Sequence, residues 1–349
     1  MKQFLLTCSF LLTLVVTGSA NGINHYFVKA GAEGQGTAWK DAFGDLQKAL
    51  AVAVEGDVIW VSTGVYTPTQ SDDRTARFVI PSGVKVYGGF AGNEKKLEDR
   101  PVEKTLTVLS GEIGDPTTVE DNSYTIVYFE NANTATLLDG FYIMDSYANG
   151  MAEVVDPSLC GGGVFNNGSE GASSPEIANC FFVNNFAREG GALYNYAENG
   201  EASPVIRNCQ FEGNRANFNG GAIFNDGNFG TCNPTITNCY FDGNESMYGA
   251  GVLNRGNYGV TQPVITDCHF YNNFSVVRGG AIYNQRDGKG LSEALVTGCI
   301  FEDNASTVGD NDVDGTIELN PAKNQPSRSG IRKRTTTTEP GAAKEAIGF

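Results

Sequence analysis

The chain has 349 residues, a formal net charge of −16 and a pI near 4.5. An acidic chain of this kind excludes nucleic acid as an expected partner, and it argues against anionic membrane surfaces. Two histidines leave little for histidine-based catalysis or metal binding. Glycine is frequent, at 44 residues, but 21 phenylalanines and 14 tyrosines argue against general disorder.

Residues 1–20 have the features of a secretory signal. Lys2 gives a positive start, an apolar stretch runs from Phe4 to Val16, and Gly18–Ala20 supplies small residues for cleavage. The apolar stretch is too short for a membrane-spanning helix, and no later segment is long and apolar enough. We therefore expect an exported protein without a transmembrane segment, either secreted or held at the cell surface.

The segment after the signal combines a helical pattern with strands. Trp39, Phe43, Leu46 and Leu50 are spaced by four, three and four residues, which predicts an amphipathic helix within residues 37–53. Apolar runs then predict short strands, at 58–61, 78–80, 84–87, 107–109, 124–129 and 137–143.

From residue 160 onward the sequence repeats about every 30 residues. Cysteines recur at spacings of 29, 30, 29 and 31 residues, and phenylalanines and asparagines keep the same step. A glycine-rich segment repeats in register, as GGGVFN, GGALYN, GGAIFN, GAGVLN and GGAIYN. The three columns are Cys180, Cys209, Cys239, Cys268 and Cys299; Phe182, Phe211, Phe241, Phe270 and Phe301; and Asn185, Asn214, Asn244, Asn273 and Asn304.

Each repeat contains short strands joined by tight bends. Cysteine and phenylalanine alternate as on one strand face, while Asn, Asp or Gly precedes each cysteine and follows each phenylalanine by two residues. These residue types tolerate the left-handed conformation, so we expect left-handed bends there. Repeats of this length and pattern predict the coils of a parallel β-solenoid, stacked about 4.8 Å apart. The predicted N-terminal helix would cap the first coil and cover its open edge.

Like residues then stack along the solenoid axis. Asn185 and its equivalents are expected to form a hydrogen-bonded ladder, and a second asparagine column is expected to form another. The five cysteines are expected to be a buried column of free thiols, because parallel stacked neighbours have poor geometry for disulfides. A disulfide is expected, if anywhere, at Cys160 and Cys232, which lie outside the column. The second asparagine column is Asn195, Asn225, Asn254 and Asn284.

The segments GDVIWVSTGVY, GVKVYGGFAGNE and LDGFYI resemble exported bacterial proteins with the right-handed parallel β-helix of the pectin-lyase-like fold. The paired GGA[ILV] and FxxN segments resemble the repeats of chlamydial polymorphic outer membrane proteins, which are adhesin-like autotransporter passengers. The likeness covers residues 24–320 and is most specific at 160–305. We see neither the C-terminal β-barrel of autotransporters nor a recognisable sorting domain.

The pectin-lyase-like resemblance also implies polysaccharide lyases and hydrolases as an alternative. Galacturonases of this fold carry paired aspartates and a Gly-His-Gly element, and neither His25 nor His269 lies in such a setting. Pectate lyases gather aspartates for calcium beside a basic residue, whereas the outward column here holds one arginine and no carboxylate cluster. That column is Ala178, Arg207, Thr237, Thr266 and Thr297. The sequence therefore assigns no catalytic residue, and it favours a binding or structural role.

Two further sets of residues are candidates for ligand contact. If the aliphatic neighbours point inward, an aromatic column points outward and offers an apolar ladder to sugar rings; stacking of the rings under a loop is the alternative. Asp310, Asp312 and Asp314 imitate half of a calcium loop but lack its final glutamate, and a polar turn before a strand at 316–319 is favoured over a calcium site. No other cofactor is expected. The aromatic column is Phe165, Tyr194, Phe224 and Tyr283, with Leu253 as its exception.

Residues 321–349 differ from the rest of the chain: they contain a threonine run, and six basic residues against two acidic ones give this tail a charge of +4. We expect a disordered basic tail on an acidic body. The domain prediction is a signal at 1–20 and one all-β domain at 21–320, a single-stranded right-handed parallel β-helix with an N-terminal amphipathic cap helix. Within it, the cap covers 24–66, irregular coils 67–159 and regular repeats 160–320. The expected function is an adhesin-like or glycan-contacting surface protein, monomeric, with a polysaccharide or host-surface component as partner.

Overall fold

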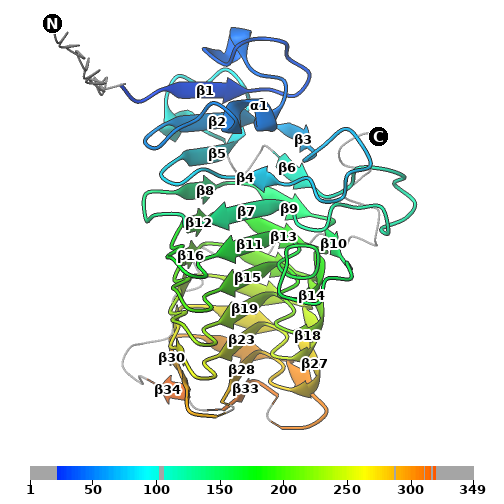
Figure 1. The fold of residues 1–349 in the computed structure, drawn as a ribbon, viewed down its shortest axis with the longest axis vertical. Helices are drawn as coiled ribbons and strands as arrows, with labels where there is room; N and C mark the ends of the chain where they lie inside the picture. Colours follow the sequence, from blue (N-terminus) through cyan, green and yellow to red (C-terminus); the bar gives the residue numbers. More distant parts are fainter. Residues whose placement is uncertain (1–21, 102–105, 287, 310, 316, 320–349) are drawn as a thin grey trace, which may run out of the picture.

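The computed structural model describes residues 22–101, 106–286, 288–309, 311–315 and 317–319. It is an all-β parallel solenoid of about nine turns with almost no helix (Figure 1). This architecture confirms the fold predicted from the repeats. The expected signal at 1–20 and the expected tail at 321–349 lie outside the described residues. Within the described part of the chain, no helix is long and apolar enough to cross a membrane.

Four parallel sheets run along the solenoid, and we name them A to D. Sheet A contains, in spatial order, β1 (His25–Val28), β2 (Val58–Ser62), β5 (Lys85–Phe90), β8 (Leu137–Asp139), β12 (Glu176–Ala178), β16 (Val205–Arg207), β20 (Thr235–Thr237), β25 (Val264–Thr266), β30 (Ala294–Thr297) and β34 (Ile317–Leu319). Sheet B contains β3 (Gly64–Tyr66), β6 (Thr107–Ser110), β9 (Tyr142–Met144), β13 (Phe181–Val183), β17 (Gln210–Glu212), β21 (Tyr240–Asp242), β26 (His269–Tyr271) and β31 (Ile300–Glu302).

The other two sheets complete each coil. Sheet C contains β4 (Phe78–Val79), β7 (Val127–Glu130), β11 (Val164–Asn167), β15 (Leu193–Tyr196), β19 (Ile223–Asp226), β23 (Val252–Arg255), β28 (Ile282–Gln285) and β33 (Val313–Asp314). Sheet D contains β10 (Tyr147–Ala148), β14 (Phe186–Glu189), β18 (Arg215–Asn219), β22 (Glu245–Tyr248), β27 (Phe274–Arg278) and β32 (Ala305–Ser306). A small fifth sheet pairs β24 (Val260–Thr261) with β29 (Leu291–Ser292).

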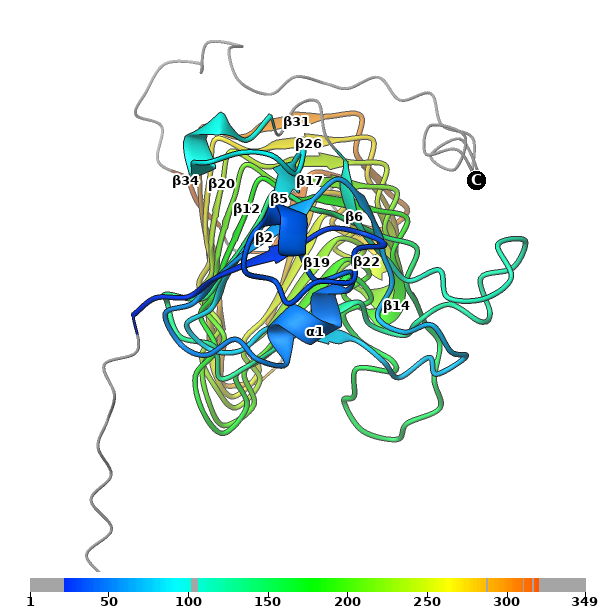
Figure 2. The ribbon, with the colours of Figure 1, turned by 90° about the horizontal axis from the view of Figure 1, so that it is seen from above.

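A regular coil visits the sheets in the order A, B, D and C, and left-handed residues make its corners. In the coil that begins at β12, Asn179 (φ 54°) bends the chain from sheet A to B, Asn184 (φ 53°) from B to D, and Gly190 (φ 64°) from D to C. The predicted bends are confirmed, because the equivalent residues of later coils also have positive φ. Longer loops return the chain from sheet C to sheet A, and they stack at one corner of the solenoid (Figure 2).

The interior is filled by like residues of successive coils. Phe182, Phe211, Phe241, Phe270 and Phe301 stack with ring centroids 4.5 to 5.2 Å apart and planes within 9° of parallel. The cysteine column packs in the same core beside an inward aliphatic column, which is Ile177, Ile206, Ile236, Ile265 and Val296. Because water is excluded from this core, the stacked rings and aliphatic side chains supply most of the hydrophobic stabilisation.

Two buried asparagine ladders run beside this core, as the sequence predicted. In the first, each Nδ2 donates to the Oδ1 of the next coil at 2.9 to 3.0 Å, from Asn185 to Asn304. In the second, the same contact repeats at 2.8 to 2.9 Å from Asn166 to Asn284. Each ladder keeps its buried amides paired, which a polar group inside an apolar core requires.

The N-terminal cap differs from the prediction. The segment expected to form one amphipathic helix over 37–53 contains a 3-10 turn at Trp39–Asp41 and a helix of five residues, α1 (Leu46–Leu50), which packs on β1 and β4. A loop covers the outer edge of β1 instead, since Phe27 N donates to Gly36 O and Phe43 N donates to Phe27 O. A second 3-10 segment lies at Leu97–Asp99.

Candidate functional site

The aromatic column predicted to bind sugar rings is mostly buried. Its aliphatic neighbours lie in the solenoid core, so the rings do point out of the coil as expected. Outside the coil, however, Phe165, Tyr194 and Phe224 form a second buried cluster with Leu159 and Cys160. Tyr283 is partly buried against the same cluster. In this structure the ladder is therefore closed to a sugar ring at three of its four aromatic positions.

A polar group lies inside this cluster. Tyr194 OH donates to Asp226 Oδ2 at 2.7 Å, and Arg255 Nε donates to Asp226 Oδ1 at 3.0 Å. The Arg255 guanidinium also lies 4.8 Å from the centre of the Phe224 ring. Burial raises the pKa of Tyr194, so the phenol keeps its proton and stays a donor. Burial has the largest effect on Glu189 and raises its pKa; the charge of Arg255 lowers that pKa by less, and the charge of Asp226 raises it further.

The cysteines are structural in this arrangement. All seven in the described chain are free, and those of the column are buried except for Cys299, which is partly exposed. Their thiols contact backbone carbonyls of the preceding coil, as Cys209 does with Ile177 O at 3.6 Å. Burial raises the pKa of Cys160 to about 12. Cys160 and Cys232, the two positions where a disulfide was more plausible, are both free and belong to separate clusters.

Two of the three aspartates of the predicted calcium loop, Asp312 and Asp314, lie among the described residues. Asp310 lies outside the described residues. Asp312 accepts a hydrogen bond from Asn304 Nδ2 at 3.1 Å, and Asp314 lies 3.7 Å from Arg278 Nη1. In the described ranges, no group of three or more His, Cys, Asp or Glu side chains has an arrangement that could hold a metal ion. The favoured polar turn and the weaker alternative of a calcium site both stay predictions.

A charged cluster on the outer face of sheet A is the candidate that the structure adds. Arg100 Nη1 lies 2.7 Å from Asp139 Oδ1, and Arg207 Nε donates to Glu176 Oε1 in the next coils of the same face. Parallel register places Tyr87, Asp139 and Ala178 side by side in β5, β8 and β12. The small Ala178 side chain lies between the two ion pairs. We call this set, with Tyr87, the sheet A cluster.

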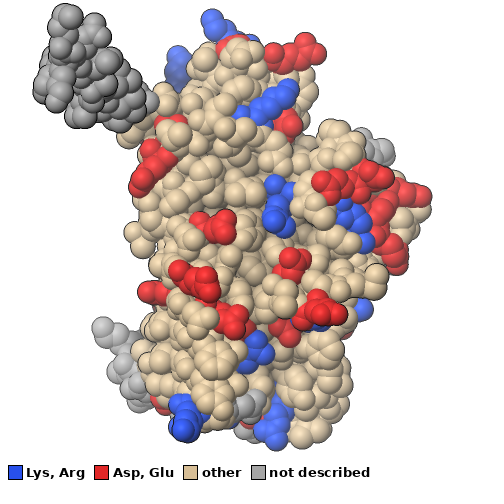
Figure 3. Space-filling model, viewed as in Figure 1, with Lys and Arg blue, Asp and Glu red and all other residues tan. Residues whose placement is uncertain are grey.

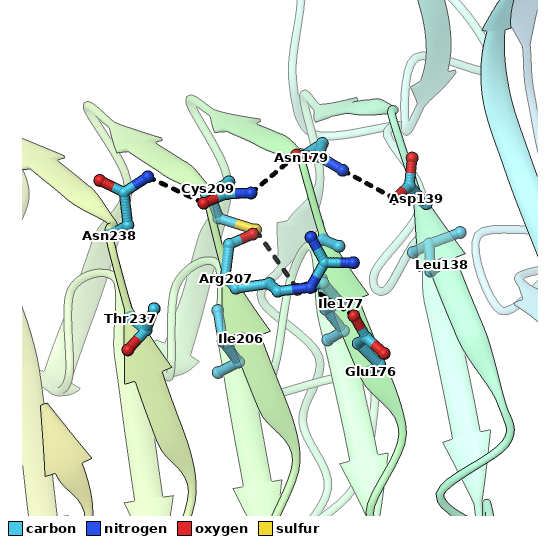
Figure 4. Close-up of polar contacts among 12 residues, drawn as sticks. Leu138, Asp139, Glu176, Ile177, Asn179, Ile206, Arg207, Cys209, Thr237 and Asn238 are labelled. Atoms are coloured by element: carbon cyan, nitrogen blue, oxygen red, sulfur yellow. Dashed lines mark hydrogen bonds and ion pairs between the residues drawn. The ribbon is translucent and has the colours of Figure 1, made fainter. Parts of the chain in front are cut away.

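An outer amide ladder connects the sheet A cluster to the later coils. Asn238 Nδ2 donates to Asn208, Asn208 Nδ2 donates to Asn179, and Asn179 Nδ2 donates to Asp139 Oδ2 at 2.7 Å (Figure 4). In Figure 4, Arg207 reaches back along the sheet toward Glu176, below this ladder. Burial and the nearby Asp139 raise the pKa of Tyr87, so this phenol stays protonated. The face therefore presents fixed donors and acceptors with its charges already paired.

This arrangement is suited to polar contact more than to acid–base chemistry. The pair Arg100 and Asp139 is almost buried, with side-chain exposures of 11% and 5%. The pair Arg207 and Glu176 is open, at 39% and 32%, and it can exchange its partner for a polar ligand. An arginine bound to a carboxylate is not a free base, and a carboxylate bound to an arginine is a weaker one.

Only some residues of the sheet A cluster could be predicted from the sequence. Arg207 was placed correctly on the outward column, since Ile206 and its equivalents point inward. The predicted outward column begins at Ala178, so it omits Asp139 and Tyr87, which lie one and two coils earlier. Glu176 lies on the other outward position of β12, as strand alternation requires. Arg100 comes from a loop, and no periodic signal pointed to it.

The comparisons agree with the repeats. Residues 208–226 and 267–285 match the model of the Chlamydia polymorphic membrane protein repeat. Each matched stretch begins at the bend before a column cysteine and ends in a strand of sheet C. No curated protein matches the chain. Among solved structures, a rhamnogalacturonan lyase is 13% identical, with 81% of this chain and 74% of that chain covered and a TM-score of 0.35. The chain is thus a parallel β-solenoid in which two stretches match the Chlamydia polymorphic membrane protein repeat.

Proposed function

We propose that this chain is an exported surface protein with an adhesin-like role, which binds a glycan or another host-surface component through the long side of its solenoid. The observation that carries the proposal is the pair of Chlamydia polymorphic membrane protein repeats within one continuous stack of coils. The name of that family refers to a membrane protein, which supports a location at the cell surface. The proposed export also rests on the signal expected at residues 1–20.

The interior of the solenoid supports a binding role through its stiffness. The phenylalanine stack and the two asparagine ladders tie each coil to both neighbours. Side chains on the outer faces therefore repeat at the coil spacing with little freedom of the backbone beneath them. A preorganised surface loses less entropy when it binds, so a stiff side is suited to contact with an extended ligand.

The test is direct binding of the labelled protein to a glycan array and to host cells. We expect saturable binding on at least one of the two, and we expect the heat-unfolded protein to lose it, because the outer faces exist only in the stacked fold. Blank results on both would contradict the proposal and leave a scaffold role.

The sheet A cluster favours one second candidate, a polysaccharide lyase or hydrolase. Two carboxylates, two arginines and a tyrosine gather on one outer face, which is the kind of arrangement that this alternative needs. The discriminating assay offers a panel of acidic polysaccharides and follows new ultraviolet absorbance or new reducing ends. Turnover that is abolished by Arg207→Gln would establish the enzyme. No turnover on any member would leave the binding role.

A further inference from the structure

The loops from sheet C to sheet A each have a tip residue in the left-handed conformation. In three coils this residue is Glu170, Asn199 or Gly288, with φ of 55°, 55° and 92°. In the two coils between them it is aromatic, Phe229 with φ 55° and Tyr258 with φ 54°. The sequences of these two loop tips are Gly-Asn-Phe-Gly and Gly-Asn-Tyr-Gly. The aromatic pair thus interrupts a column that the other coils fill with polar residues or glycine.

An aromatic residue is an unfavourable choice for this conformation. The left-handed region suits Gly, Asn and Asp, and a bulky residue there is strained. Asparagine occupies the equivalent tip at Asn199, so the loop does not require a ring. Strain of this kind persists where the surrounding structure holds it, and it is concentrated at functional sites. The strained pair is therefore a candidate for function and not only for packing.

The two rings form one rigid, open stack. Their centroids lie 5.2 Å apart with planes 6° from parallel, and Phe229 and Tyr258 are 52% and 56% exposed. Each ring covers one face of the other, so about half of each remains for a ligand. The loops beneath them are pressed together: a Cβ added to Gly230 would lie 1.7 Å from the carbonyl oxygen of Ala197. At Gly288, in the next coil, an added Cβ would lie 3.5 Å from Tyr258 Cε2, so a side chain at this position would contact the ring.

We propose that Phe229 and Tyr258 bind a neutral glycan by stacking against the apolar face of a sugar ring. This inference rests on the proposed function: it specifies the class of glycan that the surface binds and the two side chains that contact it. Aromatic rings supply apolar area at low entropic cost, and a sugar ring has the matching size. Two isolated rings are too small for a stable protein interface, which buries about 800 Å² on each partner.

The charge of the molecule selects neutral glycans. The chain carries −16 overall, and its C-terminal tail at 321–349 is basic, so the solenoid itself is more acidic still. Acidic side chains lie at several places on the face shown in Figure 3, with basic ones scattered between them. A polyuronate would be repelled by such a surface, whereas a neutral chain pays no electrostatic penalty. Neutral polysaccharides are therefore the expected ligands, and acidic ones are not.

The test is affinity electrophoresis of the full chain through gels that contain hydroxyethylcellulose, galactomannan, glycogen or polygalacturonate. We expect retardation by at least one neutral polysaccharide and none by polygalacturonate. The double variant Phe229→Asn/Tyr258→Asn should bind at least about tenfold more weakly. Its Tm should stay within about 2 °C of the parent or rise, because asparagine relieves the left-handed strain.

Phe274→Asn is the matched control, since Phe274 is a 40% exposed ring on β27 with no positive φ. It should keep the parent's retardation. The inference is overturned if the double variant binds as the parent does, if polygalacturonate alone binds, or if no polysaccharide binds. A lower Tm in the double variant with unchanged binding would assign the stack to stability, which also overturns it. If host cells bind parent and double variant equally, the adhesin-like proposal stands while this inference fails.

Discussion

Asparagine occupies two kinds of position in the same coil, and the surroundings decide what it contributes. Asn214 is fully buried, where its Oδ1 accepts from both the backbone N and the Nδ2 of Asn185. Its own Nδ2 donates to Phe182 O at 3.0 Å. Asn208 lies in the outer amide ladder and is exposed. Water can replace the contacts of Asn208, but it cannot reach those of Asn214.

Asn214→Ala should therefore destabilise the protein by about 3 kcal/mol or more, because each buried group left unpaired costs roughly 1–3 kcal/mol. Asn208→Gly is the control, since glycine accepts the φ of 56° and the lost contact is exposed. We expect it to cost less than about 1 kcal/mol. Urea denaturation of both variants makes the comparison, and equal midpoints would contradict the ladder account.

Glu189 allows a prediction of pH dependence. Burial raises its pKa, so the folded state disfavours the carboxylate. The stability that this group contributes is complete below its unfolded pKa of about 4.3 and is lost as pH rises through the higher folded pKa. Glu189→Gln keeps an oxygen for the hydrogen bond from Asn219 Nδ2. The variant should melt at a higher temperature than the parent at neutral pH, and the gap should close toward about pH 4.

The exposed Glu201→Gln removes the same charge and should change the Tm little at any pH. Thermal melts across the acidic range, followed by circular dichroism, measure both variants. A gap for Glu189→Gln that widens on acidification would contradict the assigned direction of the pKa shift.

At the scale of single elements, two glycine bends have the same φ but differ in the room that they leave for a side chain. Gly213, between sheets B and D, has φ 62°, and Gly220, between D and C, has φ 63°. An added Cβ at Gly213 would meet only Asn184 Oδ1, at 2.9 Å. At Gly220 it would lie 2.4 Å from the backbone oxygen of Ile223. The first bend can accept a side chain, while the second is closed by its own backbone.

Gly213→Asn should leave stability within about 0.5 kcal/mol of the parent, because Asn184 and Asn272 take the same place in other coils. Gly220→Asn should cost about 3 kcal/mol, since overpacking against backbone adds to the left-handed strain. The difference between the two midpoints in urea is the measured quantity. A tolerated Gly220→Asn would show that the bend can open.

The elements that sequence could predict are those fixed by repetition. Bends, ladders and stacks recur in every regular coil after residue 160, so four or five copies of each signal indicate the same fold. The cap has one copy, and its helical spacing was misleading. Trp39 packs on Phe27, Trp60 and Phe90, and its Nε1 donates to Glu94 O. The Trp39 ring is part of an aromatic cluster at the first coil. Its apolar character is explained by that cluster, so its spacing from Phe43 does not require a helix.

The candidate sites were harder to predict, because the residues that cover or complete them do not recur from coil to coil. Strand alternation gave the correct outward direction of Phe165 and its equivalents, but it could not foresee that Leu159 and Cys160 would cover them. Arg100 reaches Asp139 from a loop in another coil. The tips at Phe229 and Tyr258 carried a visible signal, two Gly-Asn-aromatic-Gly segments one repeat apart, which the columns of cysteine and phenylalanine obscured.

At the scale of the whole molecule, stability is distributed along one axis. Each coil contacts its two neighbours, so interior coils are held on both sides and end coils on one. The two ends differ. The edge of β1 is covered by Gly36 and Phe43, whereas β31 pairs with β26 alone within the described residues. Local opening should therefore begin at the end that carries β31.

Hydrogen exchange followed by mass spectrometry measures this gradient. Peptides that cover 300–306 should exchange at least about tenfold faster than those that cover 210–216, because an end coil opens without unfolding the rest. Peptides that cover 25–28 should stay slow, since the cap loop supplies the hydrogen bonds that an open edge would lack. Phe43→Pro removes the N–H that Phe27 O accepts, so it should raise exchange at 25–28 and leave 210–216 unchanged. Equal protection at 300–306 and 210–216 would mean that the edge of β31 is also covered.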